Sequence, residues 1–88
     1  MKKTGKIKKV IIDVRTPDEF KEGHAKDSIN MPLQEIEEHL SEIKKIKEPI
    51  VLVCGGGTRH VKAFELLEVH GIKSEKGGGW KEIDTTQP

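Results

Sequence analysis

The 88-residue chain contains one cysteine, Cys54. A single thiol excludes an internal disulfide framework and any zinc site made only of thiolates, so Cys54 acts alone or has no chemical role. An excess of one charge is also missing, because 16 Lys and Arg residues face 15 Asp and Glu residues and leave a formal net charge of +1. This balance gives no reason to expect nucleic acid or an acidic membrane as the main partner, and it leaves a small neutral or anionic ligand open.

Long apolar runs are missing as well. The basic start at Met1–Lys3 is like the opening of a secretory signal, but the apolar stretch Val10–Ile12 ends at Asp13. A signal needs an apolar region of about 7–15 residues, and a bilayer span needs roughly 18. We therefore expect a cytoplasmic protein. The four histidines include no pair with i, i+4 spacing on a helix, so neither a metal site nor a cofactor is expected.

The rest of the composition is that of a folding chain. Leu, Ile, Val and Phe supply 23 of the 88 residues, which exceeds the roughly 20% typical of disordered chains. A chain of this length forms one domain with a small core. We expect residues 1–88 to form that single domain, with residues 1–6 and 84–88 as flexible ends.

Strand signals alternate with helix signals along the chain. Lys9–Val14 and Ile50–Val53 are nearly continuous apolar runs, which favours strands buried on both faces of a parallel sheet. Ser28–Met31 and Ile72–Lys76 predict weaker strands. The run Gly77–Gly79 predicts a turn, because each glycine weakens a helix or strand by roughly 1 kcal/mol relative to alanine.

Three helices are expected between these strands. Thr16–Glu19 has the capping-box pattern, which predicts a helix that runs to about Glu22. Apolar residues at helical spacing predict further helices from Leu33 to about Ile46 and from Val61 to His70. Alternating strands and helices with short connections indicate an α/β fold, a parallel sheet with helices on both faces. Ligands of such sheets bind at the carboxyl ends of strands, where Cys54 lies.

The segment that follows Cys54 carries the chemical signal. Gly55, Gly56, Gly57 and Thr58 separate the cysteine from Arg59 at the start of a helix. Glycines allow backbone N–H groups to turn toward one point, and the helix N-terminus and Arg59 add positive charge. Such a cradle stabilises a thiolate, the reactive form of cysteine, and binds anionic oxygens. The alternative is a small buried core cysteine with no chemistry.

Several short blocks follow one another in a recognisable order. They are Ile11–Arg15, Glu19–Phe20, Gly23–Ala25, Ser28–Pro32, Val51–Cys54, Gly57, Arg59 and Gly78–Trp80. In this order they resemble the successive signatures of a rhodanese domain, over nearly the whole chain. The resemblance implies a three-layer α/β/α fold with a small parallel sheet of about four to five strands. It also implies a sulfurtransferase that holds sulfur as a Cys54 persulfide, with the loop from Gly55 to Arg59 binding the donor.

Other functions are weighed against this one. Related cysteine phosphatases place five residues between cysteine and arginine, whereas four stand here, Gly55 to Thr58. A shorter loop favours a persulfide over tetrahedral phosphate, and the lack of a second cysteine argues against an arsenate-type reductase. A carrier or interaction module of rhodanese fold, without turnover of small molecules, remains the main alternative.

The resemblance also implies partners and supporting residues. The sulfur donor would be a small anion such as thiosulfate or a protein persulfide, the acceptor a thiol or cyanide, and the protein a monomer. Only eight residues precede Lys9, so a first strand and helix usual in the family are missing and four strands are expected. Asp13 and Arg15 would hold the strand end beneath the loop by hydrogen bonds and a salt bridge. For His60, which stands beside Arg59 at the start of a helix, a structural role and tuning of the charge of the site both remain open.

Overall fold

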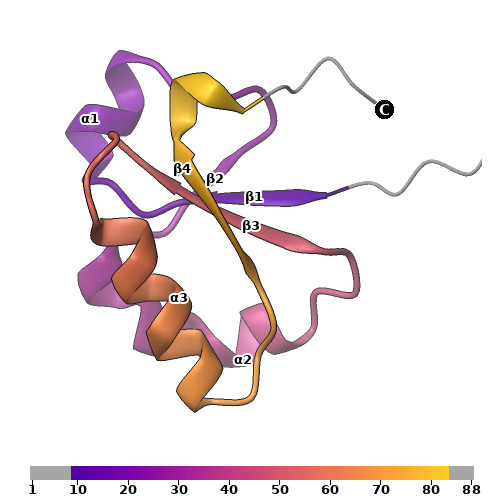
Figure 1. The fold of residues 1–88 in the computed structure, drawn as a ribbon. Helices are drawn as coiled ribbons and strands as arrows, with labels where there is room; N and C mark the ends of the chain where they lie inside the picture. Colours follow the sequence, from indigo (N-terminus) through magenta and orange to yellow (C-terminus); the bar gives the residue numbers. More distant parts are fainter. Residues whose placement is uncertain (1–8, 84–88) are drawn as a thin grey trace, which may run out of the picture.

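The computed structural model describes residues 9–83, which form one parallel sheet with helices between its strands. The strands are β1 (Val10–Asp13), β2 (Ile29–Asn30), β3 (Ile50–Cys54) and β4 (Glu75–Gly79). They lie in the order β2-β1-β3-β4 (Figure 1). The α-helices are α1 (Pro17–Glu22), α2 (Leu40–Lys44) and α3 (Arg59–Val69). Two 3₁₀ helices are also present: η1 (Leu33–His39) leads into α2, and η2 (Trp80–Glu82) follows β4. The predicted α/β fold with four parallel strands is confirmed.

Two strands, β1 and β3, form the centre of the sheet. β1 pairs with β3 in register from Val10 opposite Ile50 to Asp13 opposite Val53. Every residue of β3 is buried, as expected for a strand covered on both sides. Adjacent residues point to opposite faces, so Cys54 shares the face of Leu52 and not that of Val53.

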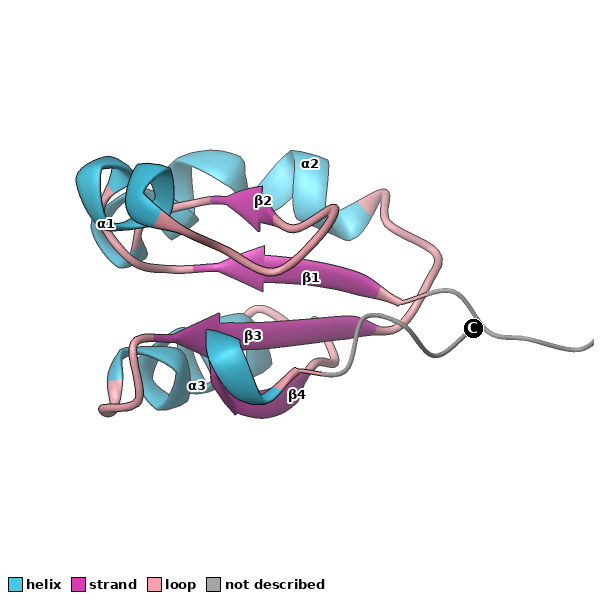
Figure 2. Ribbon diagram, turned by 90° about the horizontal axis from the view of Figure 1, so that it is seen from above, coloured by secondary structure: helices cyan, strands magenta, loops and turns pink. Residues whose placement is uncertain are grey.

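The helices form two unequal outer layers (Figures 1 and 2). η1, α2 and α3 cover one face, where Ile36, Ile43 and Leu67 pack on Ile12 and Leu52 with no side-chain exposure. The other face carries α1 and η2 (Figure 1). The main hydrophobic core therefore lies on the α2 and α3 side, and the side chain of Cys54 belongs to it.

The first helix begins as the sequence predicts. Thr16 Oγ1 accepts a hydrogen bond from the Glu19 backbone N–H (3.3 Å), and Glu19 Oε1 accepts one from the Thr16 N–H (3.1 Å). This reciprocal pair is a capping box. The helix ends where Gly23 N–H donates to Phe20 O. The capping box fixes the direction in which the Glu19 side chain leaves α1.

The second predicted helix is divided in the structure. A single α-helix from Leu33 to about Ile46 was expected, but Leu33–His39 is 3₁₀ and only Leu40–Lys44 is α-helical. Residues three apart share one side of a 3₁₀ helix, and Leu33 and Ile36 have that spacing. The predicted apolar side is correct, since Ile36 and Ile43 are both fully buried.

The predicted turn at Gly77–Gly79 is wrong, because all three glycines lie in β4. β4 shifts register against β3 between Leu52 and Val53 and bulges at Gly77. A Cβ at Gly77 would lie 2.6 Å from Val51 Cγ1 and 3.0 Å from Leu52 O. Glycine is needed here for close approach of two backbones, which outweighs its low strand propensity.

The last helix, α3, runs from Arg59 to Val69 and so begins two residues before the predicted start at Val61. Gly71 adopts a left-handed φ of 75°, as predicted for a helix stop. No helix within residues 9–83 has the length and apolar character to cross a membrane. Residues 1–6 and 84–88, expected as flexible ends, fall outside the described residues.

Candidate active site

Cys54 is the last residue of β3 and is fully buried. It stands opposite Gly79, the last residue of β4, at the carboxyl end of the sheet. Its side chain contacts the core beneath the first turns of α3, which includes Ala63. The predicted position at a strand end is confirmed, and so is the burial that the non-chemical alternative requires.

The loop from Gly55 to Thr58 is exposed throughout and leads directly into α3. Gly56 has a φ of 117°, a conformation that side chains rarely adopt. A Cβ on Gly79 would come within 3.6 Å of Gly56 Cα, so the end of β4 supports the loop. Thr58 precedes α3 without a side-chain capping bond. The buried Cys54 is therefore followed directly by an exposed loop that has almost no side chains.

His60 makes the direct contact with the cysteine. His60 Nδ1 lies 3.0 Å from Cys54 Sγ, and the residue is 9% exposed. The sequence placed His60 near the site, with a structural role or charge tuning as its expected part, and it did not predict contact with the sulfur. His60 stands six positions after Cys54 and still contacts it, because the loop reverses the chain and α3 begins directly after the loop, at Arg59.

Arg59 is held by a carboxylate from another helix. Its Nη1 and Nη2 donate to Glu19 Oε1 and Oε2 at 2.8 and 3.0 Å. These bonds, together with the Thr16 backbone N–H, lower the pKa of Glu19 to about 2, and the same pairing raises the pKa of Arg59. The loop therefore has no unpaired guanidinium in this structure. Glu19 was missed as a site residue because its partner is 40 positions away.

A second ion pair lies beneath the loop. Arg15 Nε and Nη2 donate to both carboxylate oxygens of Asp13, with the shortest bond 2.8 Å. Arg15 Nη2 also donates to Gly23 O (2.7 Å), and its guanidinium stacks over the Trp80 ring. A Cβ at Gly55 would lie 3.7 Å from Arg15 Cδ. The predicted structural pairing of Asp13 with Arg15 is confirmed, and it joins β1 to the loop.

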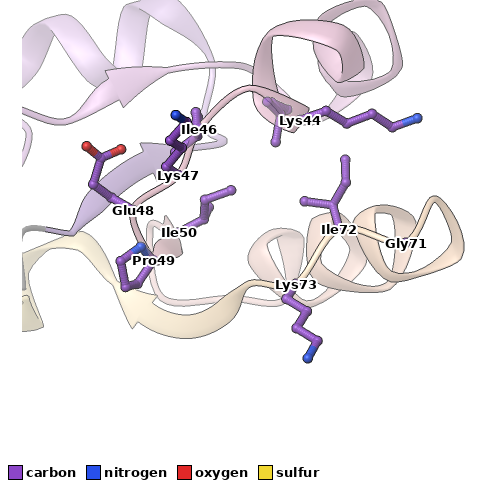
Figure 3. Close-up of a pocket in the computed structure, with 10 residues that line it drawn as sticks. Lys44, Ile46, Lys47, Glu48, Pro49, Ile50, Gly71, Ile72 and Lys73 are labelled. Atoms are coloured by element: carbon purple, nitrogen blue, oxygen red, sulfur yellow. The ribbon is translucent and has the colours of Figure 1, made fainter.

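A pocket of about 400 Å³ lies at the opposite end of the sheet (Figure 3). It is lined in part by Ile43, Ile46, Ile50 and Ile72, and Lys44 and Lys73 point away from it. None of the predicted site residues lines this pocket. Within residues 9–83, no three His, Cys, Asp or Glu side chains are grouped to hold a metal ion. The chemistry-bearing residues thus gather at the carboxyl end, away from the pocket.

Comparisons with known proteins agree with this arrangement. A family model described as Rhodanese-like domain matches residues 1–84. Thiosulfate sulfurtransferase PspE of Escherichia coli is 35% identical over 74 residues, covering 82% of this chain and 71% of that protein. A Schizosaccharomyces pombe relative is 34% identical over 93 residues, and the chain spans 66% of its length.

Solved structures show the same fold. A rhodanese with anions from E. coli superimposes with a TM-score of 0.76 at 29% identity, covering 86% of this chain and 92% of that one. A rhodanese-like domain protein from Staphylococcus aureus gives a TM-score of 0.78 at 31% identity, covering 93% and 81%.

Proposed function

This chain belongs to the rhodanese-like domain family, and from that premise we propose that it is a sulfurtransferase in which Cys54 carries the transferred sulfur. The observation that carries the proposal is the placement of Cys54. Cys54 is the last residue of the central strand β3 and is followed directly by the glycine loop. Its Sγ is in hydrogen-bond contact with His60 in the first turn of α3. The N–H groups of a first helical turn lack carbonyl partners within the helix, and they stabilise negative charge.

The proposed reaction has two displacements at sulfur. The Cys54 thiolate attacks the outer sulfur of the donor, the donor's S–S bond breaks, and its electron pair leaves with sulfite or a thiolate. Cys54 then holds an anionic persulfide. Cyanide or an acceptor thiolate attacks the outer persulfide sulfur, and the electron pair of the broken S–S bond returns to Cys54. No electrons enter or leave overall.

We infer that a protein persulfide is a better donor than thiosulfate. Thiosulfate is a dianion and needs cationic groups, but Arg59 is already paired with Glu19 and the loop has no lysine. A persulfide brings less charge and depends less on that arginine. We propose a cytoplasmic monomer that receives sulfur from such a donor and passes it to a thiol.

The test is formation of thiocyanate from thiosulfate and cyanide, and of a persulfidated thiol from a persulfide donor. Wild-type protein is expected to be active, with Cys54→Ser inactive on both donors. Ser41→Ala, an exposed change in α2, serves as a folding-neutral control. Equal activity of wild type and Cys54→Ser would remove the proposal.

A second candidate is a sulfur carrier or interaction module without turnover. Full burial of Cys54 argues against rapid turnover of small molecules, because a donor reaches Sγ only after the loop moves. Mass spectrometry separates the two. A mass increase of about 32 Da on Cys54 with negligible thiocyanate formation supports the carrier, whereas the same adduct with sustained turnover supports the enzyme.

A further inference from the structure

A buried thiol needs a group that removes its proton before it can attack sulfur. Within residues 9–83, the hydrogen-bond partner of Cys54 Sγ is His60 Nδ1 at 3.0 Å. Both side chains are shielded, at 0% and 9% exposure. We propose that His60 is the base that takes the Cys54 proton, an inference that rests on the sulfurtransferase function proposed above.

The geometry fits proton transfer along the S···N line. A neutral imidazole has one N–H and one nitrogen lone pair, and with the proton on Nε2 the lone pair of Nδ1 accepts the thiol hydrogen. Transfer of that proton gives a thiolate and an imidazolium in contact. The pair has no net charge before or after the transfer. A net charge in the buried site would oppose ionisation of the thiol, and none is added.

Other cations near the site are already engaged. The guanidinium of Arg59 is bound to Glu19, and that of Arg15 is bound to Asp13. Each guanidinium is balanced by a carboxylate in direct contact, so each stabilises a Cys54 thiolate less than a free cation would. His60 becomes positive only when the thiol gives up its proton, and the balancing charge arises in contact with the sulfur.

Charged groups on the elements that pack around α3 are the other candidates for the base of Cys54, and they contact other residues. On β4, Lys76 Nζ lies over the Phe64 ring at 5.0 Å, and Glu75 faces Lys9. On η1, His39 Nδ1 lies 2.6 Å from the Glu42 carboxylate, and its Nε2 lies 3.9 Å from that of Glu35. The charged groups just named are thus engaged elsewhere, whereas β3 contributes only apolar residues and Cys54.

The proton can be followed through the reaction. His60 Nδ1 takes it from Cys54, and the thiolate then displaces the leaving group from the donor. The imidazolium stays beside the inner sulfur of the persulfide while an acceptor thiolate attacks the outer sulfur. When the S–S electron pair returns to Cys54, the thiolate and the imidazolium are again in contact, and the pair is ready for the next donor.

His60→Asn provides a direct test, because asparagine keeps a hydrogen-bonding group near the Nδ1 position but cannot take up a proton. Thiolate is measured by ultraviolet difference absorbance against Cys54→Ser, a readout that needs no access of a reagent to the buried sulfur. We expect the thiolate signal at neutral pH to fall by about tenfold in His60→Asn. His70→Asn, an exposed histidine just beyond the same helix, should leave the signal unchanged.

A reciprocal measurement avoids any change at His60. In wild type, the NMR signals of the His60 ring nitrogens should report the proton shared with Cys54 Sγ, and this coupling should be lost in Cys54→Ser. An identical thiolate signal in wild type and folded His60→Asn, or identical His60 ring-nitrogen signals with and without Cys54, would overturn the inference. Neither measurement uses sulfur transfer, so an inactive wild type with a coupled pair removes only the proposed function.

Discussion

Glu19 and Arg59 join α1 to the first residue of α3, directly after the Gly55–Thr58 loop, through two hydrogen bonds of 2.8 and 3.0 Å. The same carboxylate closes the capping box with Thr16. One side chain thus sets the start of α1 and also neutralises the guanidinium of the loop. A forked guanidinium that is bound to a carboxylate is not free to bind a second anion. The pair therefore affects both donor preference and stability.

Glu19→Gln should improve the use of thiosulfate. Glutamine also completes a capping box, so the change removes the charge and keeps the cap. Arg59 is then free to bind the sulfonate oxygens of the donor, and we expect KM for thiosulfate to fall about fivefold with kcat little changed. Steady-state thiocyanate formation measures this. The gain should disappear in Glu19→Gln/Arg59→Gln, and an unchanged or higher KM in the single variant would contradict the role of Glu19.

The Glu19–Arg59 pair should also make stability depend on pH. The pKa of Glu19 is lowered from 4.5 to about 2 in the folded chain. Below pH 4.5 Glu19 is protonated in the unfolded chain but stays ionised in the folded chain. The contribution of the Glu19–Arg59 pair to the free energy of unfolding is therefore complete above that pH and is lost as pH falls toward 2. Both side chains are partly exposed, so salt should weaken the effect.

Thermal melts of wild type and Glu19→Gln check the sign. The Tm difference should be largest near neutral pH and should shrink steadily below about pH 5. Glu68→Gln removes an exposed carboxylate that makes no ion pair within the described residues, and its Tm difference should stay flat over the same range. A Glu19→Gln difference that grows in acid would exclude the pairing as its cause.

Gly77→Ala should destabilise the sheet. The new Cβ would meet Val51 Cγ1 at 2.6 Å and the Leu52 carbonyl at 3.0 Å, and backbone cannot yield as a flexible side chain does. We expect a loss of about 1–3 kcal/mol in the free energy of unfolding. Gly57→Ala is the matched control, since its Cβ would meet nothing within 4 Å. Urea unfolding compares the two, and equal losses would mean that close approach is not the reason for glycine at position 77.

The glycine run also shows where sequence reasoning reaches its limit. Local signals predicted the central strands, the capping box and the loop after Cys54, because each depends on neighbouring residues. Gly77–Gly79 was predicted as a turn, since propensity alone carries no information about the distance to β3. The Glu19–Arg59 pair depends likewise on how α1 and α3 are placed by the whole sheet. The contact of His60 with Cys54 depends on α3 starting at Arg59, two residues before the predicted start.

The buried pair of Asp13 and Arg15 gives the last prediction. Asp13 is fully buried and Arg15 is 5% exposed, so removal of one charge leaves the other without compensation inside the protein. Asp13→Asn should therefore lower the free energy of unfolding by about 3–5 kcal/mol. Arg15→Lys keeps the charge but loses the forked contact, and it should cost less.

Urea unfolding at neutral pH compares these variants with Asp27→Asn. Asp27 is exposed and has a positive φ of 64°, a conformation that asparagine also tolerates, so its change should stay within about 0.5 kcal/mol. If Asp13→Asn does not fold, Arg15→Lys still decides the matter. An Arg15→Lys variant as stable as wild type would show that the forked contact does not hold the strand end. Because Arg15 also bonds to Gly23 and lies beside Gly55, a destabilised Arg15→Lys should also lose sulfurtransferase activity through a misplaced loop.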